Sequence, residues 1–98
     1  MALIIPPEIA AKIAAGDHGA VSEKEVRECF ANHCGGYCYD KRPQHLDGKG
    51  NPSPWFVAET NRGRTLKIMF VREGADTFLK SAYPATVAVQ QLFKRHVK

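Results

Sequence analysis

Residues 55–83 constrain the fold more than any other stretch of the chain, because they predict three consecutive β-strands. Residues 55–60, 65–73 and 77–82 are rich in the β-branched and aromatic side chains that favour strands. The segments between them, Asn61-Arg62-Gly63-Arg64 and Gly74-Ala75-Asp76, have the composition of tight turns. Three adjacent strands with an apolar face are about the least that a stable sheet needs. We therefore expect the rest of the chain to cover this antiparallel sheet.

The two turns also predict which side chains share a face of the sheet. With Arg62-Gly63 and Gly74-Ala75 as the central turn residues, alternation along the strands gives an apolar face and a mixed face. The apolar face, which we expect to pack against the N-terminal helices and the last helix, carries Trp55, Val57, Leu66, Ile68, Phe70 and Leu79. The mixed face carries Phe56, Ala58, Lys67, Met69, Val71, Phe78, Lys80 and Ala82.

The mixed face brings Lys67 and Lys80 near each other on neighbouring strands. Like charges at such positions are mildly unfavourable, and an anion that lies across them would remove this cost. The alternative is that both amines are solvated while the aliphatic stems lie along the sheet.

Helical patterns precede and follow the strands. Isoleucines at four-residue spacing predict a first helix that ends at Gly16. Ser22 and Glu25 have the spacing of a capping box at the start of a second helix. Residues 37–39 are expected to form a short first strand, and Pro84 to begin a last helix.

The predicted fold is therefore α+β, with two N-terminal helices, an antiparallel sheet of three to four strands and a C-terminal helix. We expect the helices to lie on one face of the sheet. The length of 98 residues indicates a single domain, residues 1–98.

The net charge and the hydropathy of the sequence indicate which class of partner the protein can bind and whether it associates with membranes. The formal net charge is +4, which is compatible with nucleic acid or an acidic partner. No apolar run approaches the length that is needed to cross a membrane. We expect a cytoplasmic protein that does not associate with membranes.

Three cysteines lie within ten residues of one another, at Cys29, Cys34 and Cys38. Cys34 and Cys38, with His33 and His45 nearby, have the ligand chemistry of a zinc site, but the C-x-x-C spacing of zinc knuckles is missing. An odd number of thiols in a reducing compartment also argues against disulfides. We expect free thiols, no metal and no cofactor.

Residues 41–54 form the longest irregular stretch, since prolines and glycines interrupt regular structure there. Arg42 and His45 lie in it. A loop of this length is either a solvated connection or a ligand-facing segment.

Several phrases of the sequence, in their order, resemble the BrnT-type members of the RelE/ParE ribonuclease toxin superfamily. Asp17-His18-Gly19, then Ala20 as an apparent insertion and Val21-Ser22, stand where that family has Lys-His-Gly-Val-Ser. Arg62-Gly63-Arg64 matches a family turn, and Ser81-Ala82-Tyr83 stands where the family has Ser-Ala-Arg. The resemblance covers about residues 12–96 and implies a RelE-like fold. The Tyr83 ending is also similar to a small related family of unassigned function.

This resemblance implies a toxin of a bacterial type II toxin–antitoxin pair, which cleaves RNA without a metal and pairs with a protein antitoxin that has a DNA-binding domain. The catalytic residues carried over by position are His18 for proton transfer, Arg64 for the phosphate and Lys80 where the family has a strand arginine. The expected RNA-binding residues are Arg62, Lys67, Tyr83, Arg42 and His45. Tyr83 departs from the family arginine, which bears on catalysis, and leaves an aromatic ring that can stack on a base.

A second hypothesis is a non-catalytic binding module on the same scaffold, or a decayed toxin that still pairs with a partner protein. In that case Arg62 and Arg64 belong to a solvated turn, and His18 is a loop histidine that only packs. The sequence leaves open whether the chain forms a homo-oligomer.

Overall fold

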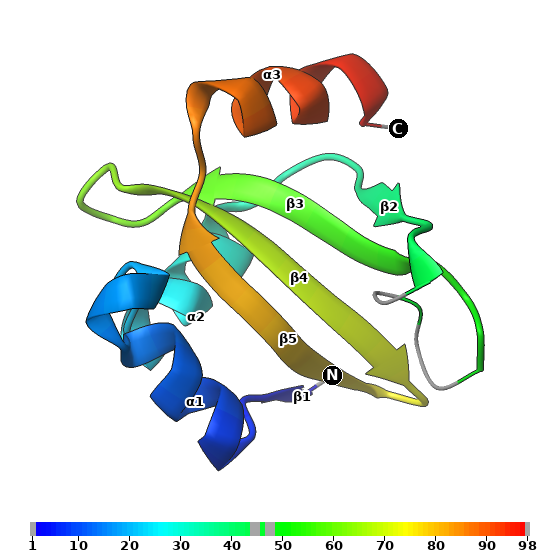
Figure 1. Ribbon diagram of the computed structural model, residues 1–98, viewed down its shortest axis with the longest axis horizontal. Helices are drawn as coiled ribbons and strands as arrows, with labels where there is room; N and C mark the ends of the chain where they lie inside the picture. The colour runs from blue at the N-terminus through cyan, green and yellow to red at the C-terminus, as the bar shows by residue number, and fades with distance from the viewer. Residues whose placement is uncertain (1, 44–45, 47–48, 98) are drawn as a thin grey trace.

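The computed structural model describes residues 2–43, 46 and 49–97. Within them, one sheet has the strand order β1-β5-β4-β3-β2, with helices packed against it (Figure 1). The elements along the chain are β1 (Ala2–Ile4), α1 (Pro7–Ala14), the 3-10 helix η1 (Gly16–His18), α2 (Glu23–Asn32), β2 (Cys38–Asp40), β3 (Ser53–Glu59), β4 (Thr65–Glu73), β5 (Asp76–Pro84) and α3 (Val87–His96).

The α+β class and the order of helices and strands are confirmed, and the sheet is wider than predicted. The predicted meander is present as β3, β4 and β5, and β2 pairs with β3 in antiparallel fashion. The additional strand, β1, pairs in parallel with β5, so the described residues form five strands instead of three or four. Three residues are too few to show an alternation pattern, which is why the sequence does not predict β1.

The β3–β4 loop differs from the prediction by one residue, and this moves β3 by one position against β4. The backbone N–H of Thr60 donates to the Arg64 carbonyl at 2.8 Å, and Gly63 has a φ of 83°. These features describe a hairpin loop of residues 61–63 with a left-handed glycine, not a two-residue turn. Glu59 consequently pairs with Thr65. A shift of one residue exchanges the two faces of a strand.

The predicted apolar face is therefore wrong for β3 and correct for the two following strands. Phe56 and Ala58 share a face with the buried β4 and β5 residues Leu66, Ile68, Phe70 and Leu79. Trp55 and Val57, which were expected on that face, belong to a second cluster with Met69. Phe70 itself is fully buried, as predicted.

A β-bulge in β5 separates the two lysines that were expected to be neighbours. Phe70 pairs with Leu79, but Met69 pairs with Ser81, so Lys80 is the extra residue between the two pairs. Beyond the bulge, Lys67 lies opposite Tyr83. The same shift moves Ala82 from the mixed face, where it was expected, to the opposite face. There it is 2% exposed and packs in the core cluster that contains Phe56 and Ile68.

The helices cover both faces of the sheet, which corrects the expectation that they lie on one. The larger core joins the sheet to α1 and α2 through Ile13, Val21, Val26 and Cys29. On the opposite face, α3 packs over Trp55 and Met69 (Figure 1). Phe93 of α3 also reaches the larger core, so the last helix is anchored to both clusters. No described helix is long and apolar enough to span a bilayer.

The helix starts follow the capping rules, with one correction. The predicted capping box is present: the Glu25 N–H donates to Ser22 Oγ at 3.1 Å, and the Ser22 N–H donates to Glu25 Oε1 at 3.0 Å. The last helix begins at Val87 with Thr86 as its N-cap, and Pro84 ends β5 instead of beginning the helix. Pro84 is tolerated there because it is a terminal strand residue.

Candidate functional site: a groove between α3 and the sheet

The face of the sheet beneath α3 is hollowed into a groove of about 940 Å³. Its walls come from β2, from the loop after β2, from one residue on each of the three central strands, and from α3. The lining residues are Tyr37, Cys38, Tyr39, Asp40, Lys41, Arg42, Pro52, Trp55, Lys67, Tyr83, Val89, Leu92 and His96. These segments are far apart in the sequence, so the groove is a product of the tertiary fold.

Lys67 lines the groove and is the least exposed of its basic residues. It is only 7% exposed and lies near the start of β4. Its amine lies 4.5 Å from the centre of the Trp55 ring and 5.6 Å from the centre of the Tyr83 ring. No hydrogen bond or ion pair joins this amine to another residue in the described part of the chain. The aromatic rings offer a cation–π contact, but no counter-charge.

Arg42 is held at the rim of the groove by Asp40. Its Nε and Nη2 atoms donate to the Asp40 carboxylate at distances of 2.6–3.2 Å, and its backbone N–H donates to Oδ1 at 3.0 Å. The hydrogen bonds to Asp40 raise the pKa of Arg42 further above its usual value. Asp40 is buried, whereas the Arg42 side chain is 58% exposed. This arrangement fixes the guanidinium in place while it remains accessible to solvent.

Large apolar side chains that are exposed gather at the same groove. Four such residues occur in the described part of the chain, and three of them, Tyr39, Tyr83 and Leu92, line it. The fourth is Val87, at the start of α3. Scattered exposed apolar residues are ordinary, but a cluster around a hollow marks a binding surface.

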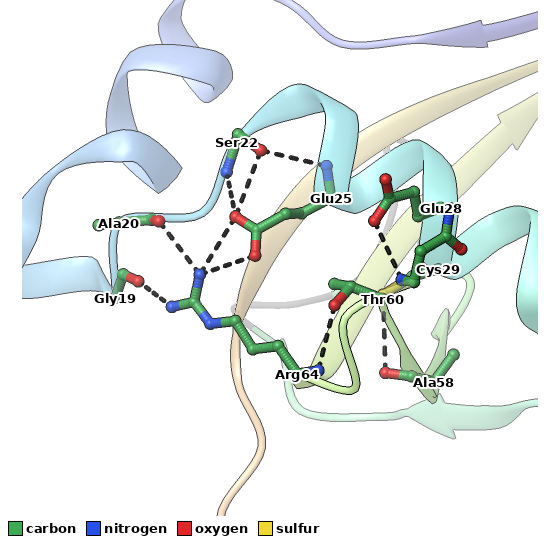
Figure 2. Close-up of polar contacts among 10 residues, drawn as sticks. Gly19, Ala20, Ser22, Glu25, Glu28, Cys29, Ala58, Thr60 and Arg64 are labelled. Carbon is green, nitrogen blue, oxygen red and sulfur yellow. Dashed lines mark hydrogen bonds and ion pairs between the residues drawn. The ribbon is translucent and has the colours of Figure 1, made fainter.

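The predicted catalytic arginine, Arg64, lies outside the groove in a network of its own (Figure 2). Its Nη1 contacts both carboxylate oxygens of Glu25 at 3.1 Å and 3.0 Å and the Ala20 carbonyl at 3.2 Å. Its Nη2 donates to the Gly19 carbonyl. Arg64 thus ties the β3–β4 hairpin to the start of α2. To hold a phosphate, it would have to give up these contacts.

Glu25 is the residue that joins this network to the helix cap. Burial alone raises its pKa, but the hydrogen bonds from the Ser22 backbone and from Arg64 outweigh this, and the pKa is lowered. The carboxylate is therefore charged at neutral pH, as an ion pair requires.

The remaining predicted site residues are dispersed. His18 is exposed at the end of η1, Arg62 is exposed at the hairpin tip, and Lys80 is the bulged residue of β5; none of them lines the groove. His45 lies outside the described residues. The predicted RNA-binding residues that the fold does bring together are Lys67, Tyr83 and Arg42.

Several groove residues were not proposed from the sequence. Tyr39, Asp40, Leu92 and His96 come from two elements on either side of the strand meander. His96 shares a helix face with Val89 and Leu92 at spacings of seven and four, so the pattern places these three together. Nothing in the pattern shows that this face of α3 meets Lys67.

The three thiols are not joined by disulfides, and no group of three potential ligands among the described residues forms a metal site. Burial raises the pKa of Cys29 to about 12, so this thiol is inert. The His33 ring stacks on Phe56 at 4.2 Å between ring centres, and burial lowers its pKa. His33 is thus used in packing.

Comparison with known proteins gives no relative on which to base an assignment. No protein-family model matches the chain, and neither a curated protein nor a solved structure is similar to it.

Proposed function

We propose that this protein binds single-stranded RNA in the groove between α3 and the sheet. The observation that supports the proposal is Lys67, a residue that is only 7% exposed, whose amine has no carboxylate partner among the described residues and which lines an open groove. An ammonium without a hydrogen-bond acceptor in the protein can donate to a ligand that supplies electron-rich atoms.

The remaining groove chemistry suits a polynucleotide better than a small anion. Tyr39 and Tyr83 expose aromatic rings on which successive bases can stack. Arg42, Lys41 and His96 are exposed residues of the lining and can follow a phosphate backbone. A groove with stacking rings and cations is typical of proteins that bind single strands with little demand on sequence.

Binding of a labelled single-stranded RNA tests the proposal. We expect affinity to fall steeply between about 50 mM and about 200 mM salt, because phosphate contacts release counterions. Lys67→Met, which keeps the aliphatic bulk, should weaken binding about tenfold or more, since a charge-assisted contact is lost.

Lys12→Met is the matched control, because Lys12 is an exposed lysine of α1 outside the groove. It removes the same charge and should have little effect. Equal affinities for Lys67→Met and Lys12→Met, with both variants folded by circular dichroism, would overturn the proposal.

We propose, as a second candidate, that the groove also cleaves the RNA, as the ribonuclease-toxin hypothesis requires. The observation that favours it is that the His96 imidazole and the Tyr83 phenol line the groove together with Lys67. Cleavage needs a base that takes the proton of the ribose 2′-OH, whose oxygen then attacks the phosphorus. It also needs an acid that protonates the departing 5′-oxygen as the P–O5′ bond breaks.

In this scheme, the exposed Arg42 guanidinium balances the charge that develops on the phosphorane. We also propose a protein partner, an antitoxin with a DNA-binding domain, which would neutralise the activity by covering the groove.

A further inference from the structure

We propose that Lys67 selects guanine, so that the groove prefers RNA with an unpaired guanine over the same RNA with adenine. This inference rests on the proposed RNA binding, and it assigns to the buried amine a role in reading a base instead of holding a phosphate.

The depth at which each cation lies separates the two roles. Lys67 is 7% exposed, and its amine is 4.5 Å from the Trp55 ring centre. The Arg42 side chain is 58% exposed and is fixed at the rim by Asp40. A flat base loses little hydration when it slides along aromatic rings, whereas a phosphate that enters to the same depth gives up most of its water. We therefore assign the phosphates to the rim and a base to the depth of the groove.

The donor pattern of the amine then decides which base is accepted. A lysine ammonium has three donors and no acceptor. Guanine presents two adjacent acceptors, N7 and O6, on one edge, while adenine presents N7 beside an amino donor. Because no described residue already bonds to the Lys67 amine, its donors are available for both guanine atoms. The adenine amino group would instead face a cation.

The experiment compares three oligocytidines of about seven nucleotides that differ only in the central base, which is guanine, hypoxanthine or adenine. Hypoxanthine has the N7 and O6 of guanine and otherwise matches adenine in size. We expect the guanine and hypoxanthine strands to bind about tenfold tighter than the adenine strand, the range of a paired contact to that edge.

Three variants distinguish base reading from general attraction. Lys67→Met should abolish the preference, and Lys67→Arg should retain it, because a guanidinium offers the same paired donors. Arg42→Met should weaken all three strands by the same factor and leave the preference intact.

The outcomes separate the two proposals. If all three strands bind in the groove with equal affinity, the guanine inference fails and RNA binding stands. A preference that survives in Lys67→Met also overturns the inference. If no strand binds to the wild type, both proposals fail together.

Discussion

Lys67 and Arg64 belong to the same hairpin and carry the same charge, but their surroundings give them different roles. Arg64 has two carboxylate oxygens and two carbonyls within reach, so its charge is satisfied by the protein. Among the described residues, Lys67 has only aromatic faces and the thiol of Cys38 near it. Burial raises the pKa of this thiol, and Lys67 partly lowers it again. A satisfied cation stabilises a fold, whereas an unsatisfied one is available to a ligand.

Arg64→Ala should therefore reduce stability and leave RNA binding nearly unchanged. The substitution removes an ion pair and leaves Glu25 without its partner, which we expect to cost about 1–3 kcal/mol in the free energy of unfolding by urea. Arg62→Ala is the control, because Arg62 is exposed at the hairpin tip, and it should cost less than about 0.5 kcal/mol. If Arg64→Ala is as stable as the wild type but binds RNA weakly, Arg64 holds the phosphate as the resemblance implies.

Among the elements, the hairpins and caps were predictable because their signals are local, whereas the register was not. The turn residues predict both hairpins, and Ser22 with Glu25 predicts the start of α2. One added residue at Gly63 and one at Lys80 decide which side chains face which helix. Both faces of the meander contain large apolar residues, so hydrophobic alternation does not choose between the two registers.

The sequence predicts only part of the groove, because its residues are brought together by long-range packing and not by local signals. Lys67 is predicted as a ligand contact from its place on a strand, Tyr83 from the resemblance and Arg42 from its loop, and all three line the groove. His96 and Leu92 join them only because α3 crosses to the face opposite α1 and α2. That choice depends on long-range packing of Phe93 and Trp55, whose ring centres are 5.7 Å apart.

The junction between η1 and the end of β5 gives a prediction at this scale. Gly19 has a φ of 97°, and a Cβ atom there would collide with the ring of Pro84. Gly19→Ala should therefore destabilise the protein by strain and by overpacking, together about 2–5 kcal/mol. Gly35 also has a positive φ, of 108°, but open space around it, so Gly35→Ala should cost only the strain, about 1–2 kcal/mol. Thermal unfolding measures both, and equal losses would contradict the close approach of Pro84.

At the scale of the whole molecule, the two faces of the sheet are specialised. The face toward α1 and α2 carries the larger core. At its edge lies the Arg64–Glu25 network, which joins the β3–β4 hairpin to α2 (Figures 1 and 2). The face toward α3 carries a smaller cluster and the groove.

This division leads to a test that separates a ribonuclease toxin from a binding module. If the groove cleaves RNA, induced expression in a bacterial host should slow growth and shorten cellular RNA. His96→Gln should then lower the cleavage rate of the purified protein about a hundredfold, the usual effect of losing a proton-transfer group. Tyr83→Arg, which restores the residue that the resemblance implies, should raise the rate because a second cation then faces the phosphorane.

Lys67→Met, which binds RNA more weakly, serves as the control in the same assay, and it should cleave RNA more slowly and slow growth less than the wild type. The decisive comparison is between binding and cleavage by one preparation of the wild type. If it binds RNA with the expected salt dependence, while growth and RNA integrity are unaffected by it and by Tyr83→Arg, the groove is a non-catalytic RNA-binding site. Unpaired charge and exposed rings are enough for binding, but cleavage also requires two groups placed to move protons in opposite directions.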